Sequence, residues 1–448
     1  MSSHRLRNAV IDLLLRIEKH GGFSHVLIDQ QMKAQKLASK DEGLLTELVY
    51  GTLERKLTLD YYLEPFIKHK KVELWVRILL RMSLYQMLYL DKVPSYAVIY
   101  EAVEIAKQRG HKGIASFVNG VLRNIQRQGV RPISDIKDPI ERLSIETSHP
   151  KWLVRRWVNH YGYELTREMC EANLTRKPLS VRIQPLRMTR EEAIEYLKQE
   201  GYEVKVSPFS EQGMIIEKGN ILQSRLFKDG LLTIQDQSSM LVAEMLDVKP
   251  GMTVLDTCSA PGGKATHIAE KMQDQGMVYA HDIHKKKINL IQEKANTLKL
   301  SIIRATQADA RQLADLYADE SFERILVDAP CSGLGVVRGK PDIKYHKEEE
   351  DIKRLAKIQM DILTSVAPLL KVNGLLIYST CTVDPEENEG VVRKFLEKHP
   401  NYTVDPNFFE SLPKICQNSP GITPFGLQLF PHLYDTDGFF LTRLIRYA

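Results

Sequence analysis

Two cysteines stand where thiol chemistry would be possible. Cys331 lies in the motif DAPCSG and Cys381 in the motif STCTVDPEENE, and each motif follows a short apolar run typical of a buried strand, 324–327 and 375–378. A free cysteine is usually a small buried hydrophobic residue. Two thiols at the ends of adjacent strands, however, would meet at one edge of a sheet. A thiolate in that position could act as a covalent nucleophile.

A glycine turn and a series of acidic residues indicate a ligand crevice at the same edge. Residues 254–264 read VLDTCSAPGGK, a strand that leads into a turn and then a helix. In open α/β sheets the ligand lies beyond the carboxyl ends of the strands, and glycine lets a cofactor approach the backbone. Asp282 ends the next strand, where a carboxylate can accept both ribose hydroxyls of an adenosine. Asp309 and Asp328 follow the third and fourth strands, and with Asp256 they are too regular to be turn residues alone.

The length and the charge distribution favour several domains and a phosphate-rich partner. A chain of 448 residues exceeds the size of one hydrophobic core, and 43% hydrophobic with 27% charged residues is typical of a folded protein. Residues 1–150 hold 23 Lys and Arg against 17 Asp and Glu, whereas the remainder holds 39 against 40. A basic face can be merely solvated, but it also attracts nucleic acid.

Cysteine spacing and hydropathy argue against a zinc-binding, a disulfide-rich and a membrane-spanning protein. The five cysteines are at least 35 residues apart, so no local zinc motif and no disulfide framework is expected. The longest uncharged stretch, 415–434, contains three prolines and is unsuited to span a membrane. We therefore expect a cytoplasmic protein, a monomer, that binds neither a metal nor a membrane.

The elements that must position these residues fall into three parts. Helical periodicity predicts an all-α domain over 1–130, followed by a proline-containing linker over 131–150. A small α/β module is predicted over 151–235, with helices at 151–161 and 189–200 and a strand at 179–183. Over 236–448, short strands alternate with helices, which predicts a Rossmann-like parallel sheet with strands at 253–255, 278–280, 302–305, 324–327 and 375–378.

The motifs resemble those of a known family. CSAPGGK, DAPCSG and STCTVDPEENE are similar to the motifs of the RNA cytosine-C5 methyltransferases, and the likeness covers residues from about 230 to 448. The segments 94–103 (PSYAVIYEAV) and 117–123 (FVNGVLR) resemble the NusB-like RNA-binding domain. This combination is similar to the bacterial enzymes that modify small-subunit (16S) ribosomal RNA. The three catalytic motifs show no departure from the family pattern.

The resemblance implies a cofactor and a role for each site residue. Cys381 would be the nucleophile, Cys331 would assist release of the product, and Asp328 would also be catalytic. Cys258 lies inside the cofactor loop and receives no chemical role. The S-adenosyl-L-methionine site would be formed by Cys258, Ser259, Ala260, Pro261, Gly262, Gly263, Lys264, Asp282, Asp309 and Asp328.

The implied chemistry explains the need for these groups. Carbon 5 of cytosine is a poor nucleophile, and attack of a thiolate on carbon 6 activates it by splitting one difficult step into two. Lys264 is a candidate for the positive neighbour that favours the Cys381 thiolate. Asp328 could accept or share a proton near N3 and the amino group. A base in a helix hides carbon 6, so the target must be unpaired or flipped out.

Two alternatives predict different behaviour. A DNA cytosine-C5 methyltransferase would use the cysteine of a Pro-Cys pair, which here is Cys331. A non-catalytic RNA-binding factor in ribosome assembly would keep the fold without activity. The Thr380-Cys381 pair and the NusB-like segments argue against the first alternative, and intact cysteines in both motifs argue against the second. The sequence does not identify the cytosine, nor whether free RNA or an assembling subunit is the substrate.

Overall fold

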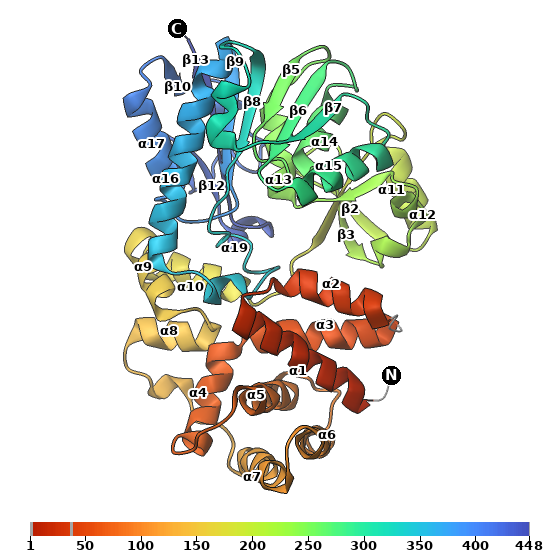
Figure 1. Cartoon of the computed structure of the whole chain (residues 1–448), viewed down its shortest axis with the longest axis vertical. Helices are drawn as coiled ribbons and strands as arrows, with labels where there is room; N and C mark the ends of the chain where they lie inside the picture. The colour runs from red at the N-terminus through yellow and green to blue at the C-terminus, as the bar shows by residue number, and fades with distance from the viewer. Residues whose placement is uncertain (1–2, 36–38, 448) are drawn as a thin grey trace. The chain divides into compact units, whose positions relative to one another are not determined.

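The chain forms two compact units. The computed structural model describes residues 3–35 and 39–447 (Figure 1). Its first unit comprises the described residues up to Thr175 together with Val337–Lys347. The second unit comprises Arg176–Val336 and the described residues from Glu348 onward. A segment that follows the Cys331 motif in the sequence therefore belongs to the helical unit.

The first unit is helical, as predicted. The helices are interrupted at 21–23 and 90–94, where glycine and proline occur, and one cluster of buried side chains joins the first seven helices. None of the described helices combines the length and the apolar character needed to cross a membrane. These seven helices are α1 (Ser3–His20), α2 (Ser24–Gln35), α3 (Ser39–Glu54), α4 (Lys56–Ile67), α5 (Leu74–Tyr89), α6 (Ser95–Arg109) and α7 (Lys112–Gln128).

The predicted linker contains ordered helix. Asp138 caps the first turn by accepting a hydrogen bond from the backbone N–H of Ile140 at 3.0 Å, and Pro139 suits the first helical position because that N–H needs no partner. The fully buried Trp157 packs against His149. The first unit continues through η1 (Ile133–Asp135), α8 (Pro139–Thr147), α9 (Lys151–Tyr161) and α10 (Tyr163–Ala172).

A small antiparallel sheet opens the second unit. The predicted strand 179–183 and the helix after it are confirmed, and Thr189 caps that helix in a capping box with Glu192. The strand order is β2-β3-β1-β4. The elements are β1 (Leu179–Ile183), α11 (Arg190–Gln199), β2 (Glu203–Val206), β3 (Gly213–Lys218), η2 (Ile221–Gln223), α12 (Arg225–Lys228) and β4 (Leu232–Ile234).

The large sheet has the predicted parallel core. Its order is β11-β12-β13-β9-β8-β5-β6-β7, and the five strands from β9 to β7 run parallel. These strands are β5 (Thr253–Asp256), β6 (Met277–Asp282), β7 (Ile303–Gln307), β8 (Phe322–Asp328) and β9 (Leu370–Thr380). The helical elements among them are α13 (Gln237–Met245), α14 (Gly263–Lys271), α15 (Lys285–Thr297), η3 (Ala310–Asp315), η4 (Ile343–Tyr345, in the first unit), α16 (Glu349–Val366) and η5 (Ala367–Leu369).

Antiparallel strands that the sequence did not predict extend the parallel core at one edge. The strands of the C-terminal segment pair antiparallel with β9 and with one another. β12 and β13 are joined without the long crossover that a parallel pair needs. The elements concerned are α17 (Glu389–Lys398), β10 (Tyr402–Val404), α18 (Phe408–Ser411), β11 (Ile422–Thr423), β12 (Gly426–Leu429), α19 (Pro431–Tyr434) and β13 (Phe439–Arg446).

Helices cover both faces of this sheet (Figure 1). Val254 and Leu326 face the core that α14 and α15 complete, whereas Leu255 and Ile325 face the core that α16 and α17 complete. Successive side chains of a strand point to opposite faces, so two-sided burial explains why these strands read as continuous apolar runs. The strand ends are left to form the site.

A buried ion pair joins the small sheet to α14. The side chains of Arg182 on β1 and Glu270 on α14 are both inaccessible to solvent, and Arg182 Nε donates to Glu270 Oε2 at 2.7 Å. The same guanidinium donates to the carbonyl oxygen of Gly263 at 3.0 Å and to Oγ1 of Thr266 at 3.1 Å. Arg182 therefore holds the end of the cofactor loop predicted from the sequence.

We predict that Arg182→Ala destabilises the second unit by about 3–5 kcal/mol, because it leaves the buried Glu270 without its partner. Urea denaturation followed by circular dichroism measures this loss. Lys218→Ala is the matched control, since Lys218 pairs with Glu203 on the exposed surface of the same unit. Equal effects of the two substitutions would contradict the role given to the buried pair.

Candidate active site

The pairing of β8 with β9 brings the two predicted cysteines together. Asp328 at the end of β8 lies opposite Ser379 on β9 in the parallel register, and each cysteine follows its strand within three residues. The sulfur atoms of Cys331 and Cys381 are 3.3 Å apart. The backbone N–H of Gly335 donates to the carbonyl oxygen of Cys381 at 3.0 Å, which ties the two loops again beyond the thiols.

The two thiols are electrostatically unequal. The hydrogen bond to Cys381 is the largest cause that raises the pKa of Cys331 well above its ordinary value, and burial and the charges of Cys381 and Glu387 add to it. The raised pKa favours the thiol form of Cys331. This asymmetry fits the roles that the resemblance implies, with Cys381 as the group that ionises.

A lysine and an aspartate stand beside the thiols. Lys264 Nζ donates to Asp328 Oδ2 at 2.7 Å, and the Ser379 hydroxyl donates to Asp328 Oδ1 at 2.8 Å. Burial disfavours the charge of Lys264, but the attraction of Asp328, with a smaller contribution from Cys381, outweighs it and raises the pKa of Lys264. The ammonium of Lys264 therefore serves both the Asp328 carboxylate and the Cys381 thiolate.

The predicted cofactor loop connects β5 to α14. Gly262 caps α14 in the left-handed region, at φ 90°, and a side chain there would press on the backbone of Ile291. Neither carboxylate oxygen of the fully buried Asp256, nor the Ser259 hydroxyl, meets a hydrogen-bond partner in good geometry within the described chain. Burial is the largest cause that raises the pKa of Asp256 to about 7. Buried polar groups beside a glycine turn fit a polar ligand such as a nucleoside.

Asp282 and Asp309 lie at neighbouring strand ends, with different contacts. Asp282 is 8% exposed, and its Oδ1 accepts from the backbone N–H of His284 at 2.9 Å. Asp309 accepts from the backbone and side chain of Arg311, which is the largest cause that lowers the pKa of Asp309. Burial, and after it the charges of Asp256, Asp328 and Asp282, raise the pKa of Cys258 to about 12. Three of the four acidic strand ends thus face the cofactor loop, while Asp309 acts on its own turn.

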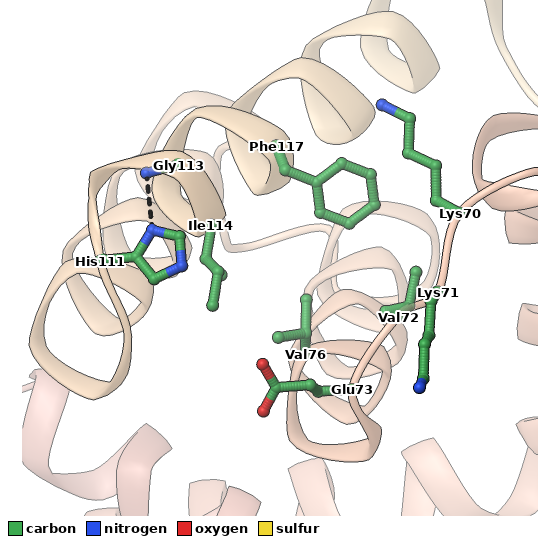
Figure 2. A pocket seen from close by; sticks show the side chains of 9 residues that line it. All are labelled: Lys70, Lys71, Val72, Glu73, Val76, His111, Gly113, Ile114 and Phe117. Atoms are coloured by element: carbon green, nitrogen blue, oxygen red, sulfur yellow. Dashed lines mark hydrogen bonds between the residues drawn. The ribbon is translucent and has the colours of Figure 1, made fainter.

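The described residues include no group of three or more histidine, cysteine, aspartate or glutamate side chains that could hold a metal ion. A separate pocket of about 190 Å³ lies in the first unit between the α4–α5 connection and α7 (Figure 2). None of the residues predicted for the catalytic site lines this pocket. Its wall combines apolar and basic side chains, among them Lys70, Lys71, Val72, Val76, Ile114 and Phe117.

The residues that follow Cys381 in its motif received no role from the sequence. The buried Glu387 accepts hydrogen bonds from Ser332, next to Cys331, and the buried Asn388 is bonded to both neighbours of Cys381. The only signal for them in the sequence was a run of polar residues directly after a buried strand. An exposed loop would give the same pattern. The partners could only be known from the folded chain.

Family comparisons cover the whole architecture. Residues 243–445 match the family described as 16S rRNA methyltransferase RsmB/F. Residues 4–127 match the NusB family, and residues 149–222 match the ferredoxin-like domain of RsmF/B-like methyltransferases. The small antiparallel sheet with α11 accordingly belongs to a domain type that accompanies this methyltransferase.

Individual proteins are similar over almost the full length. The chain is 48% identical to the probable ribosomal RNA small subunit methyltransferase B of Bacillus subtilis (strain 168), with 98% of each chain covered. It is 32% identical to the ribosomal RNA small subunit methyltransferase B of Pseudomonas syringae pv. tomato, covering 92% of this chain and 91% of that protein. The crystal structure of PH0851 has a TM-score of 0.83 and 26% identity, covering 100% of this chain and 99% of the other.

The unequal thiols generate a test by alkylation. At pH 8 we expect iodoacetamide to modify Cys381 before the other four cysteines, because burial raises the pKa of Cys170, Cys258 and Cys416 to about 12 and the contact with Cys381 raises that of Cys331. Peptide mapping by mass spectrometry measures the order. Lys264→Gln should slow modification of Cys381. Earlier labelling of Cys331 would reverse the assignment of the two thiols.

Proposed function

Because this chain belongs to the family of 16S rRNA methyltransferases RsmB/F, we propose that it acts through a covalent bond between Cys381 and carbon 6 of a cytosine in 16S ribosomal RNA. The reaction transfers a methyl group from S-adenosyl-L-methionine to carbon 5 of that base. The observation that carries the proposal is the 3.3 Å contact between the sulfur atoms of Cys331 and Cys381, beside the Lys264–Asp328 pair.

The two thiols divide the reaction into addition and elimination. The Cys381 thiolate attacks carbon 6, so that a sulfur–carbon bond forms and electron density moves towards carbon 5, which then takes the methyl group. Cys331, after its own thiol proton has passed to solvent, removes the proton from carbon 5, directly or through a water molecule. The electrons of that carbon–hydrogen bond restore the ring double bond as the Cys381 sulfur leaves. Once its sulfur is bonded to carbon 6, Cys381 is no longer a thiolate, so it no longer favours the thiol form of Cys331. The largest cause of the raised pKa of Cys331 is then lost.

Asp328 and Lys264 act on the base and on the nucleophile. Asp328 is held by Lys264 and Ser379 on two different oxygens, so its orientation is fixed before a base binds. We assign to Asp328 the contact with N3 and the amino group of the cytosine, where it could accept or share a proton as the charge on the ring changes. Lys264 favours the Cys381 thiolate through its positive charge.

The loop 258–264 and the neighbouring strand ends would hold the cofactor. S-adenosyl-L-methionine supplies an electrophilic methyl group when it is bound there. Asp282 accepts the ribose hydroxyls, for which its buried carboxylate at the end of β6 is suited. The loop Cys258–Lys264 provides backbone groups, and Asp309 keeps the turn after β7 in place through its contacts with Arg311.

The RNA must present an unpaired cytosine, since a stacked and paired base hides carbon 6. The helical unit, which matches the NusB family, carries the basic run Lys68-His69-Lys70-Lys71 beside the pocket of Figure 2. Lys70 Nζ lies 4.9 Å from the centre of the Phe117 ring. A basic surface next to an aromatic side chain suits a phosphate backbone with an exposed base. An rRNA substrate places the reaction in the cytoplasm.

The DNA-type alternative, with Cys331 as the nucleophile, is disfavoured by the raised pKa of Cys331. The assembly-factor alternative is disfavoured by the close contact of two partly exposed thiols, which structural packing would not require. Incubation with tritiated S-adenosylmethionine and RNA or DNA separates the alternatives by showing which polymer, if any, becomes labelled.

The division of labour predicts different behaviour for the two cysteine variants. Cys381→Ser should form neither product nor adduct, because a hydroxyl does not ionise as a thiol does. Cys331→Ser should transfer the methyl group but stall as a covalent protein–RNA complex, because elimination is hindered. A denaturing gel with labelled RNA shows this complex as a slow band that requires S-adenosylmethionine.

The double variant provides the control, since it should lose the band that Cys331→Ser accumulates. The opposite pattern, with an adduct in Cys381→Ser and none in Cys331→Ser, would give the nucleophilic role to Cys331 and support the DNA-type mechanism.

We predict that Asp282→Ala raises the KM for S-adenosylmethionine at least about 10-fold, since a hydrogen bond to a charged acceptor contributes about 1.5–3 kcal/mol. Methyl-transfer kinetics at saturating RNA measure the effect. Asp319→Ala, which changes an exposed carboxylate in the turn before β8, is the control and should leave this KM unchanged. An unchanged KM in Asp282→Ala would show that the ribose binds elsewhere.

A further inference from the structure

Two consecutive residues bind both of the loops that carry the thiols. Glu387 and Asn388 follow Cys381 by six and seven residues, just before α17, and both are buried, at 0% and 1% exposure. The reaction proposed above assigns no part to either residue. Their side chains nevertheless form hydrogen bonds directly to the neighbours of Cys331 and of Cys381.

Glu387 holds the loop of Cys331. Its Oε1 accepts from the backbone N–H of Ser332 at 2.8 Å, and its Oε2 accepts from the hydroxyl of Ser332 at 2.5 Å. Ser332 directly follows Cys331, so these two bonds fix the orientation of the peptide that carries the thiol. No lysine, arginine or histidine of the described chain forms an ion pair with Glu387. The carboxylate is therefore satisfied by this loop and its neighbours rather than by a counter-ion.

Asn388 holds the loop of Cys381 in the same way. Its Oδ1 accepts from the hydroxyl of Thr380 at 2.5 Å, and its Nδ2 donates to the carbonyl oxygen of Thr382 at 3.1 Å. These residues lie immediately before and after Cys381. One side chain thus fixes both flanks of the nucleophile, while Gln428 of β12 accepts a further hydrogen bond from Asn388 Nδ2 at 2.7 Å.

Other buried groups fix this pair itself. Gln359 of α16 donates to Glu387 Oε1 and to the carbonyl oxygen of Pro330, both at 3.0 Å, so it reaches the residue before Cys331 as well. The Tyr378 hydroxyl donates to the carbonyl oxygen of Glu387 at 2.5 Å. A fully satisfied buried network is rigid, because any displacement leaves a polar group without a partner.

We propose that Glu387 and Asn388 are positioning residues, with Glu387 acting chiefly on Cys331 through Ser332 and Asn388 chiefly on Cys381 through its flanking residues. The hydroxyls of Ser332 and Thr382, 2.9 Å apart, link the two loops. The inference rests on the roles proposed above for the two cysteines. Burial, the largest cause, raises the pKa of Glu387 to about 7, while the bonds from Ser332 oppose this shift. The hydrogen bonds from Ser332 therefore influence both the charge and the position of the Glu387 side chain.

The consequence is that loss of each residue should reproduce a different cysteine defect. Glu387→Ala releases Ser332 and displaces Cys331, so elimination should fail and the covalent RNA complex should accumulate as in Cys331→Ser. Asn388→Ala displaces Cys381, so adduct and product should decline together. In both variants we expect turnover to fall about 100-fold, the effect of displacing a reacting group by about 1 Å, with the KM for S-adenosylmethionine unchanged.

Conservative and control variants separate positioning from folding. Glu387→Gln keeps an oxygen that can accept from the N–H of Ser332, so it should retain most of the activity lost in Glu387→Ala. Ser332→Ala removes the hydroxyl and its hydrogen bonds to Glu387 Oε2 and to Oγ1 of Thr382, but keeps the backbone bond to Glu387, so it should give a weaker form of the same adduct accumulation. Glu389→Ala, two residues away at the start of α17 and partly exposed, should behave as the unmodified protein.

The experiment is the denaturing gel with labelled RNA, run on all variants beside Cys331→Ser and Cys381→Ser, with the KM for S-adenosylmethionine measured in parallel. If Cys331→Ser accumulates the adduct and neither Glu387→Ala nor Ser332→Ala does, the inference is overturned while the proposed function stands. If Cys331→Ser accumulates no adduct, the roles of the cysteines are wrong. A uniform loss of activity with a raised KM in every variant would identify Glu387 and Asn388 as structural residues only.

Discussion

The parallel hydrogen bonding between β8 and β9 is the constraint on which the site depends. It places Asp328 opposite Ser379, and the two loops that leave these strands then carry Cys331 and Cys381 to a distance of 3.3 Å. A shift of one residue in this register would turn Asp328 to the other face of the sheet and separate it from Ser379. Apolar side chains of β8 and β9 pack into the cores on both faces of the sheet, so a shifted pairing would lose these contacts.

The loops themselves are fixed by polar groups that come from several elements. Gln359 on α16, Glu387 and Asn388 before α17, and Gln428 on β12 all contribute hydrogen bonds to this network. Arg182 on β1 does the same for the cofactor loop. The antiparallel extension and the small sheet therefore contribute to the site, because each supplies a buried side chain that fixes a loop of the parallel core.

The chain beyond the Cys331 loop is held in the first unit. There Asp342 accepts hydrogen bonds from the backbone and hydroxyl of Ser24, and the fully buried Lys344 donates to the carbonyl oxygen of Glu54 at 3.1 Å. Burial lowers the pKa of Lys344 to about 7 and raises that of Glu54 to about 6. The loop of Cys331 is thus anchored at one end by β8 and at the other by a segment that the helical unit encloses.

The sequence by itself determined the features that depend on local pattern. The helix breaks, the strand 179–183, the cap at Thr189 and the five parallel strands follow from periodicity, turn residues and capping, which act over a few residues. The motifs also predicted a site formed by both thiols, the loop 258–264 and Asp328, and the fold brings the two thiols together. Only the tertiary structure decided the helix in 139–147, the antiparallel strands after α17, and the partners of Arg182, Glu387 and Asn388. These depend on contacts between residues far apart in the chain, where a buried polar side chain and an exposed one have the same appearance in the sequence.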